Sequence, residues 1–184
     1  MRKVLILFFL LFLQMSYSQN RFSVEILSGF GFNNNLTLFN EEVENYTSST
    51  VQFNLNYRFK IIKEFFIETG LGTQLYFSSG NIRTSRFKSS TLRLKLPVLI
   101  GYNLFKKVSI NTGVAIANNR EFNDLDFRAN YNLRTSFLLK GNYSIKDNFE
   151  VVLLIQKNIS DIPDLFFINQ PNLDVSLGVS YKLF

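Results

Sequence analysis

Apolar and polar residues alternate over about eight segments of this chain, which follow an apolar leader. The clearest segment runs from Val51 to Lys60, where every odd position is large and apolar and every even position is polar or charged. A period of two places one class of side chain on each face of a β-strand. The alternation predicts strands at residues 21–32, 49–60, 65–77, 91–104, 107–117, 131–140, 148–157 and 172–183.

The connections between these strands alternate in length. We place short links at Ile61–Glu64, Phe105–Lys106 and Gly141–Asp147, and long links at Asn33–Ser48, Ser78–Ser90, Asn118–Asn130 and Asn158–Pro171. Small outer-membrane barrels have tight periplasmic turns and longer outer loops. We therefore predict an all-β fold, an eight-stranded antiparallel up-and-down transmembrane β-barrel of the outer membrane. Its even number of strands places both termini on the periplasmic side.

The leader has the composition of an export signal. Two basic residues precede an apolar run over Val4–Leu13, and small residues at Ser16 and Ser18 surround a cleavage site. The run is too short to cross a hydrocarbon core of ~30 Å as a helix. This length disfavours the alternative of a retained N-terminal anchor. We expect a signal peptide over residues 1–18 and a single barrel domain over residues 19–184.

The position of glycine indicates which face of the barrel points inward. An eight-stranded barrel is barely wide enough inside for side chains, so small residues suit its lumen. A soluble ligand-carrying barrel would instead turn its bulky apolar face inward and leave exposed strand glycines unexplained. We predict that the polar face lines the lumen, that the apolar face meets lipid, and that aromatic residues near the strand ends mark the interfaces. Gly80 and Gly141 are assigned to connections, whereas seven glycines share the parity of the polar residues in their strands: Gly29, Gly31, Gly70, Gly72, Gly101, Gly113 and Gly178.

Pro97 falls in the middle of a predicted strand. Proline has no backbone N–H, so a closed barrel loses one ladder hydrogen bond at this position. We expect a local bulge or an unpaired stretch there. We interpret it as a bend that accommodates the coiling of the barrel, with a functional seam as the alternative.

Ionisable residues on the inward face form the main candidate site. Charges in a narrow lumen are tolerated only when they are paired and hydrogen-bonded. We predict a network of salt bridges that acts as a structural plug, with a gate for small ions as the alternative. Lys60, Lys140 and Lys182 share the inward parity, and the network itself is assigned to Glu25, Arg58, Glu68, Arg93, Lys95, Arg134, Glu150 and Asp174.

Three segments resemble a known family. Leu94–Tyr102 is similar to the central strand of the porin-like, PorT-type outer-membrane β-barrel family of the Bacteroidota. Gly113–Ala115 resembles the block that follows it, and Leu177–Phe184 resembles the closing strand of that family. The resemblance implies an outer-membrane barrel, and for PorT-type members a link to a protein-secretion apparatus.

Composition narrows the chemistry that the chain can perform. It contains no histidine and no cysteine, which removes the usual general base, thiol nucleophiles, thiolate metal sites and disulfides. We therefore expect no enzymatic activity, no cofactor and no metal site. The acidic stretch Glu41–Glu44 could hold a divalent cation through oxygen ligands, but an ordinary solvated loop is the preferred interpretation.

Basic residues outnumber acidic ones, and three of them fall in one predicted loop. Without the leader, 18 basic and 14 acidic residues remain. Arg83, Arg86 and Lys88 are candidates for contact with the phosphates of lipopolysaccharide, and nothing suggests nucleic acid. We expect a structural or interaction protein of the cell envelope that works through its long outer loops. Its expected partners are outer-membrane lipid, lipopolysaccharide, the barrel-assembly machinery and an envelope or secretion protein. A secretion accessory, a narrow ion or small-solute pore and a soluble ligand carrier are the alternatives.

Overall fold

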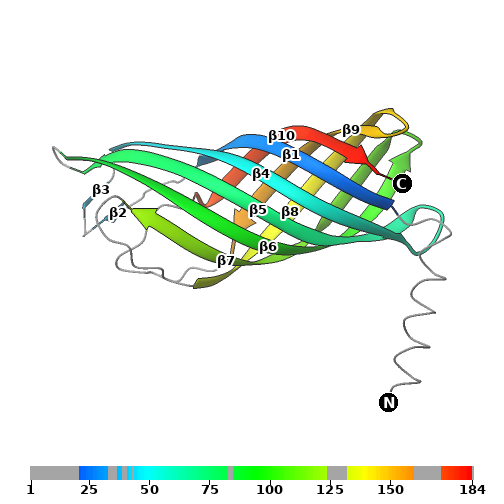
Figure 1. The fold of residues 1–184 in the computed structure, drawn as a ribbon, viewed down its shortest axis with the longest axis horizontal. Helices are drawn as coiled ribbons and strands as arrows, with labels where there is room; N and C mark the ends of the chain where they lie inside the picture. Colours follow the sequence, from blue (N-terminus) through cyan, green and yellow to red (C-terminus); the bar gives the residue numbers. More distant parts are fainter. Residues whose placement is uncertain are drawn as a thin grey trace, which may run out of the picture.

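The protein is a closed antiparallel β-barrel in a computed structural model that describes residues 21–32, 37–38, 41–42, 44–82, 85–123, 132–159 and 171–183. Its strands follow the order β1-β10-β9-β8-β7-β6-β5-β4, and β4 pairs with β1 to close the ring (Figure 1). The predicted fold class, an eight-stranded antiparallel barrel, is confirmed. The eight strands are β1 (Arg21–Phe32), β4 (Glu44–Lys60), β5 (Phe65–Ile82), β6 (Ser85–Phe105), β7 (Val108–Asn123), β8 (Asn132–Lys146), β9 (Phe149–Asn158) and β10 (Leu173–Lys182). A small separate sheet pairs β2 (Thr37–Leu38) with β3 (Glu41–Glu42).

All eight strands lie where the alternation predicts them, but two predicted connections are wrong and two others are too long. β4 already begins at Glu44, inside the predicted link Asn33–Ser48, and β7 continues to Asn123, inside the predicted link Asn118–Asn130. The predicted link Ser78–Ser90 is instead the top of a long hairpin, because β5 continues to Ile82 and β6 begins at Ser85. The predicted link Gly141–Asp147 belongs mostly to β8, which ends at Lys146 before a turn at 147–148. Serine, glycine and asparagine favour turns when taken alone. In both places a full row of cross-strand partners overrides that local preference.

The barrel has two distinct ends. The turn end carries the links 61–64, 106–107 and 147–148 together with the described chain ends Arg21 and Leu183, and it lies at the right in Figure 1. The extended end carries the β5–β6 hairpin and the small β2–β3 sheet, at the left of the same view. The strands differ in length, from 10 residues in β9 and β10 to 18 in β5 and 21 in β6. The tall strands stand next to one another on one side of the barrel.

The outer wall of the barrel is apolar. Side chains alternate between buried and exposed along the strands, and the exposed members are large and hydrophobic, as at Leu71 (64% exposed) and Ile100 (61%). Polar side chains occupy the inward positions, so the predicted orientation of the two faces is confirmed. Three cross-strand aromatic pairs ring the turn end, with ring centroids 4.6 to 4.9 Å apart: Phe22–Tyr57, Phe65–Tyr102 and Phe149–Tyr181. Among the described residues, no helix is long and apolar enough to cross a membrane.

Strand glycines allow neighbouring strands to approach closely. A Cβ atom on Gly178 would lie 2.0 Å from the carbonyl oxygen of Ile26 on β1, and one on Gly70 would lie 2.1 Å from that of Leu55 on β4. Neither carbonyl can move without breaking the ladder. Gly141 was assigned to a connection, but it lies inside β8, where an added Cβ would meet nothing within 4 Å. Gly80, assigned likewise, lies inside β5 and is buried.

Pro97 interrupts one ladder of its strand and leaves the other intact. On the β7 side, Pro97 pairs with Ala115 in an unbroken register. On the β5 side, the pairing stops after Val98 and resumes at Lys95 without a shift of register. The Thr69 hydroxyl on β5 donates to the Pro97 carbonyl oxygen at 2.9 Å. The structure therefore has the expected unpaired stretch and no bulge.

Candidate functional site: the lumen and the extended-end wall

The lumen is filled with side chains that the eight strands direct inward. Its ionisable members are almost fully buried: Glu25, Glu68, Arg93, Lys95, Lys140 and Asp174 are at most 3% exposed. They divide into two groups along the barrel axis. One group lies near the turn end and the other lies toward the extended end.

The group near the turn end, which we call the turn-end cluster, consists of three carboxylates and three cations: Glu25, Glu68, Glu150, Arg58, Lys140 and Lys182. The Lys140 ammonium lies between the carboxylates of Glu25 and Glu68 and forms an ion pair with both. Arg58 donates from Nη2 to Glu68 Oε2 at 2.9 Å and lies 3.8 Å from Glu150. Lys182 completes the set with a 2.8 Å ion pair to Glu150. Opposite charges are therefore matched in number within this cluster.

The second group, the amide-held cluster, consists of Gln52, Gln74, Tyr76, Arg93, Lys95, Asp174 and Ser176. Lys95 donates its ammonium hydrogen bond to the side-chain oxygen of Gln52. The Gln52 amide in turn donates to the Ser176 hydroxyl at 3.0 Å, and that hydroxyl donates to Asp174 at 2.6 Å. Among the described residues, no carboxylate forms an ion pair with Lys95. The neutral amide of Gln52 thus contacts this buried ammonium directly, and the hydroxyl of Ser176 links that amide to Asp174.

Arg93 anchors the amide-held cluster to the extended end. Its Nη1 donates to the Tyr76 hydroxyl at 3.3 Å and to the side-chain oxygen of Asn158 at 3.1 Å. Its guanidinium carbon lies 5.1 Å from the centre of the Tyr76 ring, within the range of a cation–π interaction. Gln74 donates to Asp174 at 3.3 Å from the same level of the barrel. This level of the lumen is therefore crossed by side chains.

An apolar patch fills the remaining wall of the lumen. It consists of Leu27, Leu99, Ala115, Leu138, Val152 and Leu154, all at most 3% exposed. The alternation did not predict it, because only polar and small residues were assigned to the inward face. A signal existed in the sequence: the pairs Leu138-Leu139 and Val151-Val152 break the period of two inside otherwise alternating strands.

The structure brings together some of the predicted lumen residues and separates others. Glu25, Glu68 and Glu150 share the turn-end cluster with Arg58, but their other ion-pair partners are Lys140 and Lys182, which the candidate network left out. Arg93, Lys95 and Asp174 belong to the amide-held cluster instead. Arg134, on the same inward face, is half-buried on β8, in register with Ala117.

The extended-end wall carries the predicted lipopolysaccharide contacts. Arg86 and Lys88 lie on β6 and are exposed, both on its outward face, and Lys88 is in register with Ser79. Arg83 lies outside the described residues. Of the acidic stretch Glu41–Glu44, the structure describes no side chain. Within the described part of the chain, no group of three or more acidic residues is placed to hold a metal ion.

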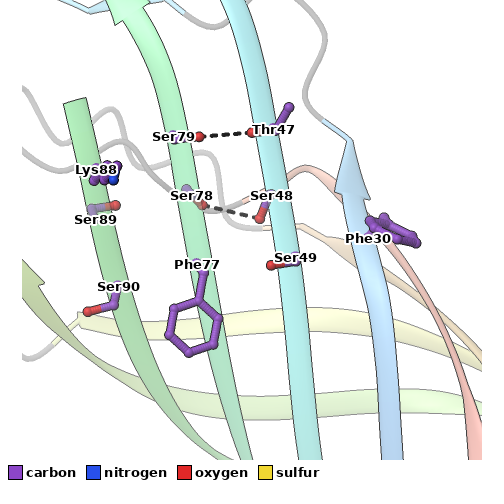
Figure 2. A pocket seen from close by; sticks show the side chains of 10 residues that line it. All are labelled: Phe30, Thr47, Ser48, Ser49, Phe77, Ser78, Ser79, Lys88, Ser89 and Ser90. Carbon is purple, nitrogen blue, oxygen red and sulfur yellow. Dashed lines mark hydrogen bonds between the residues drawn. The ribbon is translucent and has the colours of Figure 1, made fainter. Parts of the chain in front are cut away.

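A groove of about 560 Å³ opens on the outer surface beside Lys88. Figure 2 shows its lining, which comes from β1, β4, β5 and β6. A cross-strand row places the small Ser49 between the rings of Phe30 and Phe77, with Ser90 next along the row. One step toward the extended end, the hydroxyls of Thr47 and Ser79 form a 2.9 Å hydrogen bond. The groove thus has aromatic sides, a hydroxyl-rich floor and one ammonium.

Comparisons with known proteins establish the fold. No protein-family model matches the chain, and no curated protein matches it. The crystal structure of Neisserial surface protein A matches with a TM-score of 0.54 and 12% identity, over 89% of this chain and 97% of that one. Ail of Yersinia pestis, solved in complex with the heparin analogue sucrose octasulfate, matches with a TM-score of 0.51 and 10% identity, over 89% and 97%. The fold is that of the small outer-membrane barrels. The resemblance to PorT-type proteins stays a prediction.

Proposed function

We propose that this protein is a non-enzymatic β-barrel of the outer membrane, sealed through its lumen, that acts as a structural or interaction protein of the cell envelope through its extended end. The observation that carries the proposal is the inverted distribution of its residues. Large apolar side chains cover the outer wall, whereas buried ion pairs and amides fill the interior. Apolar surface of this extent is stable only in contact with lipid.

The filled lumen argues against transport as the main role. Eight strands leave an interior just wide enough for side chains. In this barrel both levels of the lumen are bridged, by Lys140 between β1 and β5 and by the chain from Lys95 through Gln52 to Ser176. A solute would have to break these contacts in order to pass. The extended end, where the tall strands project, is then the part of the molecule that is free to meet a partner.

Outer-membrane location follows from the same features together with the predicted signal peptide. The turn end, which carries the described chain ends and the aromatic ring, then faces the periplasm, and the extended end faces outward. The finer proposal, an accessory of a protein-secretion apparatus, rests on the resemblance of Leu94–Tyr102 to PorT-type proteins. It predicts a stable complex with an envelope protein and a loss of export when the chain is deleted.

A gel-mobility and conductance experiment tests the proposal. The protein is recovered from the outer-membrane fraction, and boiled and unboiled samples are compared on a denaturing gel. We expect a heat-dependent shift, because a closed barrel resists detergent until it is heated. The same protein in planar lipid bilayers is expected to give no steady conductance, and a wide trimeric porin added afterwards serves as the positive control. Recovery in the soluble periplasmic extract would overturn the membrane assignment, and reproducible channels would favour the narrow pore.

A further inference from the structure

We propose that the groove beside Lys88, which we call the extended-end groove, binds the phosphorylated sugar headgroup of an outer-leaflet glycolipid. One acyl chain of this lipid would lie along the outer wall of the barrel nearer the turn end. The inference rests on the proposed function, because the groove meets lipid only if the barrel spans the outer membrane. It goes further than the function by naming the ligand class and the residues that would hold it. Lys88, Ser49, Phe30 and Phe77 are the central residues of this site.

The shape of the groove arises from one small residue between two large ones. Phe30, Ser49 and Phe77 are direct cross-strand neighbours on β1, β4 and β5, and all three point outward. The rings are 68% and 50% exposed, so neither is covered by the rest of the described protein. Serine leaves a gap at the centre, which a bulky outward residue would close. A pyranose ring has a flat apolar face that can lie against such aromatic side chains.

The polar groups of the groove suit a phosphorylated sugar. Thr47, Ser79 and Ser90 supply hydroxyls that can donate to and accept from sugar hydroxyls. Lys88 supplies a compact ammonium on the outward face, in register with Ser79, and an ammonium of this kind is a common phosphate ligand. Arg86 adds a second exposed cation on the same face of β6. None of the residues that line the groove is acidic, which suits an anionic headgroup.

A second groove, which shares β4, β5 and β6 with the first and extends over β7 and β8, favours a lipid over a soluble glycan. It has a volume of about 440 Å³, and aliphatic side chains such as Leu71, Leu94 and Ile116 dominate its lining. It lies nearer the turn end, because its lining on β4 begins at Phe53, four residues beyond Ser49. Four residues of strand span about 13 Å, which is within the length of a fatty-acyl chain. The extended-end groove, proposed for the headgroup, and the aliphatic groove, proposed for the acyl chain, therefore lie along the barrel axis in the order that an outer-leaflet lipid requires.

Native mass spectrometry of the folded protein in detergent tests the site. The probe is a hexa-acylated glucosamine disaccharide that carries two phosphates, and its dephosphorylated form and sucrose octasulfate are used in parallel. We expect the wild type to retain one probe molecule. Lys88→Gln should weaken retention about tenfold through loss of one charge-assisted phosphate contact. Ser49→Phe should abolish retention by filling the gap, and Thr112→Phe, which adds the same ring on the outward face of β7, should leave it unchanged.

Several outcomes would overturn the inference. Equal retention of the probe by Ser49→Phe and the wild type would place the lipid elsewhere. Equal retention of the phosphorylated and dephosphorylated probes would show that the phosphates do not contribute to binding. Tighter binding of sucrose octasulfate than of the acylated probe would make the groove a glycan site. Every variant is first checked for the heat-dependent gel shift. A folded, heat-modifiable barrel that retains no probe contradicts this inference alone, whereas absence of the shift in the wild type contradicts the proposed function.

Discussion

The two clusters of the lumen each contain a buried lysine, and they hold its ammonium group in different ways. In the turn-end cluster, Lys140 lies between two carboxylates, and each cation of the cluster has at least one carboxylate partner. In the amide-held cluster, Lys95 is buried to the same 3% exposed fraction, but its partner is the neutral oxygen of Gln52. Both ammonium groups have lost their hydration. Of the two, only Lys140 forms direct ion pairs with carboxylates.

From this difference we expect two equally buried charges to contribute differently to stability. Removal of one member of a buried ion pair leaves its partner charged and unpaired, which is strongly destabilising. Removal of a buried charge that has only an amide partner also removes the penalty of its desolvation. The same substitution at the two lysines is therefore expected to destabilise the protein strongly at Lys140 and little, if at all, at Lys95. Three substitution experiments, ordered by the expected size of the effect, test this contrast.

The largest effect is expected for Lys140→Met. Methionine keeps much of the volume of lysine but leaves Glu25 and Glu68 facing each other without the shared cation. We expect a loss of about 3–5 kcal/mol in the free energy of unfolding. Urea unfolding of the protein in lipid vesicles measures it, with Lys63→Met in the exposed link after β4 as the control. A loss below about 1 kcal/mol would mean that the cluster is held by something other than this lysine.

An intermediate effect is expected for Gly70→Ala, with Gly72→Ala as its matched partner. The added methyl group at Gly70 meets the Leu55 carbonyl of the neighbouring strand at 2.1 Å, so the backbone of the turn-end level has to move. At Gly72 the nearest atoms belong to the side chains of Asn54 and Lys95, which can shift. We expect a loss of about 1–3 kcal/mol at Gly70 and a smaller one at Gly72. Equal losses in the same urea experiment would show that the amide-held level is as rigid as the turn-end level.

The smallest effect, and the most informative one, is expected for Lys95→Met. The substitution removes a buried ammonium and leaves the Gln52 oxygen without its donor. An unsatisfied buried acceptor costs about 1–3 kcal/mol, whereas the effective desolvation penalty of a buried ion is several kcal/mol. We expect an unfolding free energy within about 1 kcal/mol of the wild type, or above it. A loss comparable to that of Lys140→Met would contradict the contrast between the two levels.

The sequence predicts the faces of the barrel well, because face depends only on parity. Lys140 illustrates what parity leaves out. It lies on β8, whereas its partners Glu25 and Glu68 lie on β1 and β5, and neither strand pairs with β8. Such contacts across the lumen depend on the height of each residue along its strand and on how far successive strands are shifted relative to one another around the barrel. Parity assigned all eleven ionisable residues to one face, but it could not choose among their possible partners.

Strand ends show a second limit of prediction from sequence. The segment Ser78–Ser90 is rich in residues that favour turns, and yet it forms paired strands up to Ile82 and from Ser85. The hydrogen bond between the hydroxyls of Thr47 and Ser79 joins this hairpin to β4. Partners of this kind are 32 residues apart in the chain. A local sequence pattern cannot detect contacts between residues so far apart in the chain. The groove that depends on these contacts is therefore not predictable from the alternation.

Because its strands differ in height, the barrel has two unlike sides when it is viewed within the membrane plane. The 10 residues of β10 span ~33 Å along the strand, or roughly 25 Å of height after a tilt of about 40°, which matches the hydrocarbon thickness. The 21 residues of β6 reach roughly 50 Å on the same basis. On one side of the barrel the tall strands therefore project above the bilayer. The strands on the opposite side end at the bilayer surface. A molecule that diffuses laterally in the membrane would therefore meet a different face of the barrel depending on the direction from which it approaches.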